Sequence, residues 1–281
     1  MRLSPATRNL LRGGVFITLA FIYIPLIVIA IYAFNGGNSL QWPPPSLTTE
    51  WFGQAIDNSG ARDALITSLK VGAVATGIAL LLGSLASFAV ARFRFFGRET
   101  MSFLVVLPIA LPGVVTGVAL SNTFTQVLGV DLSLLTVIAG HATFCIVVVY
   151  NNVIARLRRV SGNLEEASAD LGAHTWQTLR FVTLPSIQTA LVAGGLLAFA
   201  LSFDEIIVTN FTIGAGEQTL PIWIFSNLFR PHNLPIVNVV AVLVVLLSII
   251  PVYLAHRLTR EEGVAARAGG AGAIAESTAI P

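Results

Sequence analysis

Residues 156–186 read RLRRVSGNLEEASADLGAHTWQTLRFVTLPS, and they separate two long apolar segments at 133–155 and 186–209. The stretch is the most charged part of a 281-residue chain in which only 11% of residues are charged and 55% are hydrophobic. A soluble domain carries about 25% charged residues. A chain this poor in charge cannot cover its own surface in water, so composition predicts an integral membrane protein in which 156–186 is an exposed loop.

Working outward from this loop, six segments are nearly free of charge and long enough for the ~20 residues that a membrane helix needs. They are 14–34, 64–91, 100–122, 133–155, 186–209 and 235–255. They are continuously apolar and do not alternate, which favours helices over a β-barrel. The predicted fold class is therefore all-α, with six transmembrane helices, and Pro108 and Pro112 are expected to kink the third.

Basic residues predict the orientation of the chain. Thirteen of its 16 Lys and Arg residues fall on one side of the six segments: Arg2, Arg8, Arg12, Arg92, Arg94, Arg98, Arg156, Arg158, Arg159, Arg180, Arg257, Arg260 and Arg267. The positive-inside rule places this side, and both termini, in the cytoplasm.

The domain organisation follows from the same segments. We expect a cytoplasmic N-terminus at 1–13, one membrane domain at 14–260 and a disordered cytoplasmic tail at 261–281, which is rich in small residues. In the first outer loop, the WF pair within LTTEWFGQAI (47–56) predicts a short helix at the membrane interface.

Catalytic and metal-binding motifs are missing from the sequence. The only lysine, Lys70, is followed by valine, so no phosphate-binding G-x-x-x-x-G-K-[ST] motif exists and the chain is not expected to hydrolyse ATP. The single cysteine and four scattered histidines predict no metal site, and the net charge of +2 gives no reason to expect nucleic acid. His141 and Cys145 lie one turn apart, which fits a hydrogen-bonded packing histidine beside a small apolar residue.

The loop itself has the signals of folded helices. Asn163 is expected to cap a helix with an acidic first turn, and Gly172 to end it. Thr175 is expected to cap a second helix, and Pro185 to mark a break before the fifth segment. A short protruding helix of this kind is typical of an element that docks into a groove.

The loop also resembles a known signature. Membrane subunits of ATP-binding-cassette importers carry the pattern E-A-A, three residues, G, nine residues, I-x-L-P. Here it reads Glu166-Ala167-Ser168, three residues, Gly172, nine residues and Val182-Thr183-Leu184-Pro185. Serine replaces the second alanine and valine the isoleucine. The segments LPIALPG, GHATFCIVVVYNNVIARLRR and LAFALSFDEIIVTNF resemble the polyamine (spermidine/putrescine) branch of that family, and its second permease more than its first.

The resemblance implies a type I importer permease in the bacterial inner membrane that is not itself an enzyme. Its implied partners are a homodimer of ATP-binding subunits that use ATP and Mg, a second and different permease chain, a periplasmic substrate-binding protein and the lipid bilayer. The chain itself would bind no cofactor. The residues that would couple it to the ATPase are Glu165, Glu166, Ala167, Ser168, Asp170, Leu171, Gly172, Leu184 and Pro185.

Asp204 and Glu205 are adjacent carboxylates about 18 residues into the fifth segment. A carboxylate inside a membrane costs about 2.5–3.5 kcal/mol, so it usually faces a cavity or a partner. One hypothesis is that the pair lines the path of a cationic substrate such as a polyamine. The alternatives are contact with Lys70 or with a partner chain, and exposure at the interface.

Other functions stay open at this point. A secondary transporter or channel would work without nucleotide, but it would be expected to carry internal repeats that we do not find. An intramembrane enzyme would need a nucleophile paired with a base, and no motif in the sequence suggests such a pair. Within the importer class, other small cations, amino-acid-like solutes and ferric iron are alternatives to polyamines.

Overall fold

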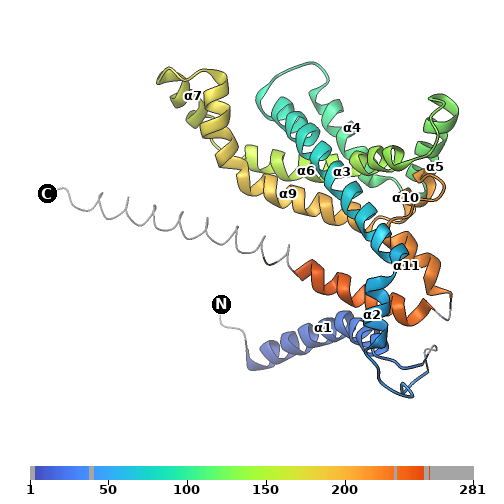
Figure 1. Ribbon diagram of the computed structural model, residues 1–281. Helices are drawn as coiled ribbons and strands as arrows, with labels where there is room; N and C mark the ends of the chain where they lie inside the picture. Colours follow the sequence, from blue (N-terminus) through green and yellow to red (C-terminus); the bar gives the residue numbers. More distant parts are fainter. Residues whose placement is uncertain (1–3, 38–40, 231–232, 250–252, 254–281) are drawn as a thin grey trace. The chain divides into compact units, whose positions relative to one another are not determined.

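The computed structural model describes residues 4–37, 41–230, 233–249 and 253. Helices make up nearly all of their regular structure, which confirms the all-α class (Figure 1). In chain order they are α1 (Pro5–Ala33), α2 (Glu50–Asp57), α3 (Ser59–Arg92), α4 (Arg98–Ala110), α5 (Gly113–Asn122), the π-helix η1 (Thr123–Val127), α6 (Leu134–Leu157), α7 (Asn163–Asp170), α8 (Thr175–Thr178), the π-helix η2 (Leu179–Thr183), α9 (Leu184–Asp204), α10 (Ile207–Thr212), α11 (Leu220–Leu228) and an apolar helix at Leu234–Ile249.

The chain divides into two compact units. The first comprises residues 1–62 and 223–248, and the second comprises 63–222 and 249–281. The predicted tail at 261–281 and the end of the sixth predicted segment, at 250–252 and 254–255, lie outside the described residues.

Four described helices are long and apolar enough to cross a membrane: α1, α3, α6 and the run Thr175–Asp204. The pair Arg98–Ala110 and Gly113–Val127 makes a fifth if it is counted as one span. The helix at Leu234–Ile249 is apolar but shorter. The structure thus supports four or five of the six predicted spans.

The third predicted span differs from expectation. We predicted a single kinked helix at 100–122, but the chain forms two helices bent by 106°. Pro108 is tolerated inside α4, whereas Leu111, which precedes Pro112, has the extended conformation with φ −84° and ψ 142°. The ring of a proline disfavours helical geometry in the residue before it, and this explains a break where we expected a kink.

The fifth predicted span differs at both ends. Its helical run begins at Thr175, eleven residues before the predicted start, and the expected break at Pro185 is absent because η2 leads directly into α9. The run ends at Asp204 and not at residue 209, since Glu205 is extended and a new helix, α10, follows. The segment is therefore broken on one side and continuous with the loop on the other.

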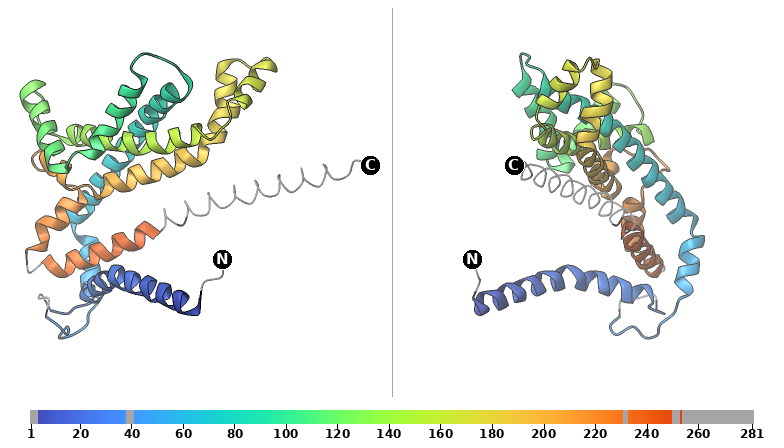
Figure 2. Two further views of the ribbon diagram at one scale, coloured as in Figure 1. Left: turned by 180° about the vertical axis from the view of Figure 1, so that it is seen from behind. Right: turned by 90° about the vertical axis from the view of Figure 1, so that its left-hand side faces the viewer.

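In the first unit, α1 is a long helix that contains Pro25 (Figure 2). None of the residues in its most apolar stretch is buried. A short helix, α2, is present where the sequence predicted one. The indole Nε1 of Trp51 donates to the carbonyl oxygen of Asn35 at 2.7 Å, and the rings of Phe34 and Phe52 lie 4.9 Å apart. These contacts hold α2 against the end of α1.

In the second unit, α6 and α9 lie side by side (Figures 1 and 2), and α3 packs against both through small residues. Val149, Val153 and Leu157 of α6 are fully buried in the core. At Gly83 a Cβ would lie 2.9 Å from the carbonyl oxygen of Ile146, so only glycine allows α3 to approach α6 this closely. The Ser87 hydroxyl, one turn on, bonds to the carbonyl oxygen of Tyr150 at 3.1 Å.

We expect Gly83→Ala to lower the stability of the bundle by about 1–3 kcal/mol, because the added methyl overpacks a backbone contact that cannot move aside. Gly77→Ala is the matched control on the same helix, since nothing lies within 4 Å of its Cβ. The midpoint of thermal unfolding in detergent should fall for the first variant and not for the second. Equal midpoints would contradict this account of the α3–α6 packing.

Candidate functional site

The charged loop folds as a helix and a tight turn. The helix α7 begins at Asn163 with Gly162 as its N-cap residue, so the expected Asn163 cap is wrong. Gly172 ends the turn after α7, as predicted, with φ +84°. This left-handed conformation suits glycine, and it lets the Ala173 amide bond to the Ser168 carbonyl at 3.1 Å.

The second helix of the loop starts at Thr175, the residue expected to be its cap, so the cap lies one residue earlier than predicted. His174 and not Thr175 precedes α8, and its amide donates to Gln177 Oε1 at 3.0 Å. The hydroxyls of Ser168 and Thr178 lie 3.0 Å apart and join α7 to α8. In η2 the Leu184 amide bonds to the Leu179 carbonyl, the wide spacing of a π-helix, and this turn carries the chain past Pro185 without a break.

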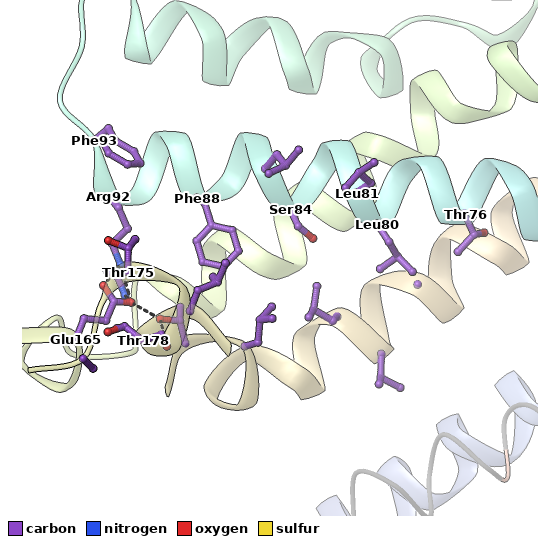
Figure 3. A pocket seen from close by; sticks show the side chains of 18 of the residues that line it. Thr76, Leu80, Leu81, Ser84, Phe88, Arg92, Phe93, Glu165, Thr175 and Thr178 are labelled. Carbon is purple, nitrogen blue, oxygen red and sulfur yellow. Dashed lines mark hydrogen bonds and ion pairs between the residues drawn. The ribbon is translucent and has the colours of Figure 1, made fainter. Parts of the chain in front are cut away.

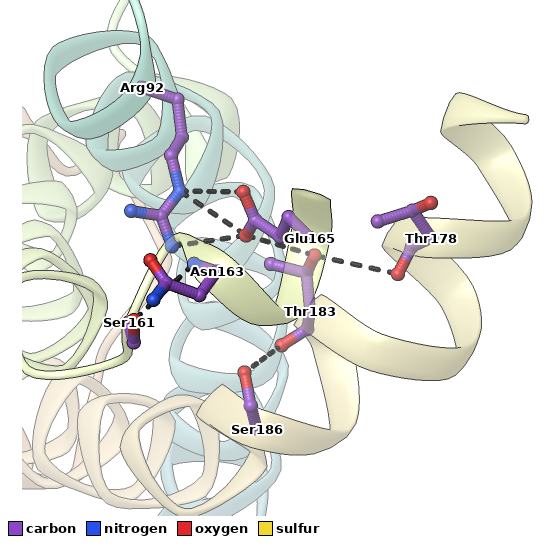
Figure 4. Close-up of polar contacts among 7 residues, drawn as sticks. All are labelled: Arg92, Ser161, Asn163, Glu165, Thr178, Thr183 and Ser186. Atoms are coloured by element: carbon purple, nitrogen blue, oxygen red, sulfur yellow. Dashed lines mark hydrogen bonds and ion pairs between the residues drawn. The ribbon is translucent and has the colours of Figure 1, made fainter. Parts of the chain in front are cut away.

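Glu165 turns inward, away from the loop surface (Figure 4). Its carboxylate forms an ion pair with Arg92, the last residue of α3, with Nε 3.0 Å from Oε2 and Nη2 3.0 Å from Oε1. The Thr183 hydroxyl in η2 also donates to Oε1 at 3.1 Å. Glu165 was predicted to face the ATPase, and the structure gives it partners within this chain.

The other predicted loop residues are mostly on the surface. Exposed side chains are those of Glu166, Ala167, Asp170, Leu171 and Pro185, whereas Ser168 and Leu184 are partly buried. Leu171 is 89% exposed and Trp176, which we did not select, is 60% exposed. An aromatic residue in a polar loop is a visible signal, so Trp176 could have been chosen from the sequence.

A cavity of about 1100 Å³ lies between the loop, α3 and α9 (Figure 3). Its walls are largely apolar, with Leu80 and Phe88 from α3 and Leu191 and Phe199 from α9. Arg92 and Glu165 line the end nearest the loop, and Thr183 of η2 lines the cavity as well.

The two predicted path carboxylates have different environments. Asp204, the last residue of α9, is exposed, and its side chain has no hydrogen bond or ion pair with any residue the structure describes, Lys70 included. Glu205 is half-buried, and its Oε1 accepts a hydrogen bond from the Val208 amide at 2.9 Å. The Glu205 side chain therefore satisfies an amide in the first turn of α10, whose N-cap residue is Ile206, while Asp204 remains available to another molecule.

His141 holds the broken helix in place from α6. Its Nδ1 lies 2.7 Å from the Ser202 hydroxyl, before the break, and its Nε2 lies 2.8 Å from the Thr209 hydroxyl, after it. His141 and Cys145 are both buried. The predicted packing role of His141 is confirmed, and its partners lie on the two sides of the break.

The fold and the loop match a known family. Residues 79–261 match the family model described as binding-protein-dependent transport system inner membrane component. The chain belongs to this family and is a non-catalytic inner-membrane permease component of an ATP-binding-cassette transporter.

Among its relatives is the putrescine transport system permease protein PotI of Escherichia coli K12, which is 33% identical over 80% of this chain and 81% of its own length. The spermidine/putrescine transport system permease protein PotC of the same organism is 31% identical over 90% of this chain and 96% of its own length. A bacterial transporter that imports the acidic polysaccharide alginate shares the fold, with a TM-score of 0.69 over 93% of this chain and 99% of its own, at 17% identity.

Proposed function

We propose that this chain is one of two permease subunits of a polyamine importer, with putrescine or spermidine as substrate. Its near full-length similarity to two polyamine permeases is the observation that carries the proposal. In the proposed topology six helices cross the inner membrane, both termini are cytoplasmic, and a periplasmic binding protein delivers the solute to the outer face.

The loop 156–185 is proposed to dock on an ATP-binding subunit. The outward residues of α7 and its turn, Glu166, Asp170 and Leu171, combine negative charge with an exposed apolar side chain. Trp176 adds a second exposed apolar group on α8. Exposed aromatic residues are typical of the centre of a protein interface, and charged residues are typical of its polar rim.

One coupling loop per chain implies two permease chains over a pair of ATPase subunits. ATP and Mg would be bound by those subunits and no cofactor by this chain. Binding and release of ATP would move the two loops, and the loops would shift the spans between outward- and inward-open states.

Asp204 is proposed to face the path of the cationic substrate. The support is its position at the break between α9 and α10 with no partner among the described residues. Glu205 supports the path indirectly, because its carboxylate fixes the start of α10.

The class is tested by purifying the tagged chain from native membranes in mild detergent and identifying the proteins that accompany it. An ATP-binding subunit and a second permease are expected, and uptake of radiolabelled putrescine and spermidine should require all of them. A chain that comes alone, under conditions that preserve a known importer, would favour a nucleotide-independent transporter. A complete complex that takes up neither polyamine would exclude putrescine and spermidine as substrates, and the chain would still be an importer permease.

A further inference from the structure

Glu165 occupies an unusual place in the loop, because it joins α7 both to η2 in the same loop and to the end of α3, 73 residues earlier. It lies in the first turn of α7, it pairs with Arg92 at the end of α3, and it accepts a hydrogen bond from Thr183 at the end of η2 (Figure 4). Arg92 contributes two nitrogens, Nε and Nη2, to the same carboxylate. An arginine held by two bonds fixes direction as well as distance, which a single contact does not.

The open space beside this ion pair makes the orientation of α7 depend on it. The cavity of about 1100 Å³ lies beside it, between the loop and the apolar faces of α3 and α9 (Figure 3). A loop that rests on tightly packed side chains would be held by many weak contacts at once. Here part of the space between the loop and the two helices is open, so the orientation of α7 relies more heavily on its polar contacts.

The pair is also partly buried. Both side chains are 24% exposed, and they lie at the end of a cavity with largely apolar walls. Charges in such a place are screened less than those on an open surface. Loss of one partner leaves the other charge unpaired beside apolar walls, which is more disruptive than loss of both.

We propose that Arg92, Glu165 and Thr183 form a latch that sets the orientation of α7 and transmits its displacement to α3 and α9. Arg92 and Thr183 are thus positioning residues for coupling, and Glu165 is the hub between them. This rests on the proposed function, in which the loop 156–185 receives motion from an ATP-binding subunit. When the latch is broken, the loop still moves with the ATPase subunit, but its displacement is no longer passed on to α3 and α9.

The test uses the complete complex, purified from native membranes and reconstituted in vesicles. Arg92→Met and Glu165→Gln break the ion pair, and Arg92→Glu with Glu165→Arg restores it with the charges exchanged. Arg94→Met and Glu99→Gln are matched controls, since both residues are exposed and neither lines the cavity. The readouts are co-purification of the ATPase subunit, ATP hydrolysis, and uptake of radiolabelled putrescine and spermidine.

For each single latch variant we expect normal co-purification and a fall of about fivefold or more in polyamine imported per ATP hydrolysed. The charge exchange should recover a good part of this ratio, and the two controls should keep it. A merely structural role would lower the amount of complex and leave the ratio of the remainder unchanged.

Two kinds of failure are distinguishable. If the unsubstituted complex lacks an ATP-binding subunit or shows no ATP-dependent uptake, the proposed function fails. If it works and the Arg92→Met and Glu165→Gln complexes keep the normal ratio, or if the exchanged pair is no better than the single variants, the latch is overturned while the proposed function stands.

Discussion

Replacement of Glu166 by arginine is expected to abolish ATP-driven uptake and to reduce binding-protein-stimulated ATP hydrolysis by about tenfold or more. A reversed charge at a docking surface places like charges together, which weakens the free energy of binding to the partner by several kcal/mol. Glu166 is exposed and makes no side-chain hydrogen bond or ion pair with any residue the structure describes. The substitution should therefore leave the helical bundle folded.

The measurement is ATP hydrolysis and uptake by the reconstituted complex, with thermal unfolding of the purified chain as the check on folding. Glu99→Arg is the matched control, because it makes the same change of charge at another exposed position in the first turn of a helix. Normal stimulated hydrolysis in the Glu166→Arg complex would count decisively against α7 as the docking element.

Replacement of Asp204 by asparagine is expected to reduce uptake of putrescine and spermidine by about tenfold or more, because a hydrogen bond to a charged group contributes about 1.5–3 kcal/mol. Asparagine keeps the size of the side chain and removes its charge. Asp204 has no partner in the described chain that would be disturbed, so assembly of the complex should be unaffected.

Glu205→Gln separates this role from general damage at the helix break. Its amide oxygen can still accept the bond from the Val208 amide, so the first turn of α10 should stay in place and uptake should fall much less. Uptake kinetics would be measured over a range of substrate concentrations for both variants. Unchanged kinetics for Asp204→Asn would remove Asp204 from the substrate path.

Features that depend on nearby residues were predictable from the sequence. Apolar length identified the long helices, and a glycine ended α7 where the chain needs a left-handed residue. The spacing around Glu166 identified the family. The two prolines of the third segment indicated a distortion, but they do not by themselves specify its size of 106°.

Features that depend on distant residues were not predictable. No glycine or proline marks the break at Glu205, which is stabilised by His141 through contacts 61 and 68 residues apart in sequence. The inward turn of Glu165 depends on Arg92, 73 residues earlier. A single sequence assigns both glutamates of the loop to one acidic face, whereas the fold uses one of them internally and leaves the other outside.

The π-helix η2 sets the direction in which this loop points from α9. A π turn is an α turn with one residue inserted, and one residue corresponds to a rotation of about 100° around a helix axis. The extra residue therefore fixes the rotation, about the axis of α9, of every residue on the loop side of η2, including Thr178 and its bond to Ser168. Deleting one residue within Leu179–Thr183 would reset that angle and aim the loop elsewhere, although every side chain that remains is unchanged.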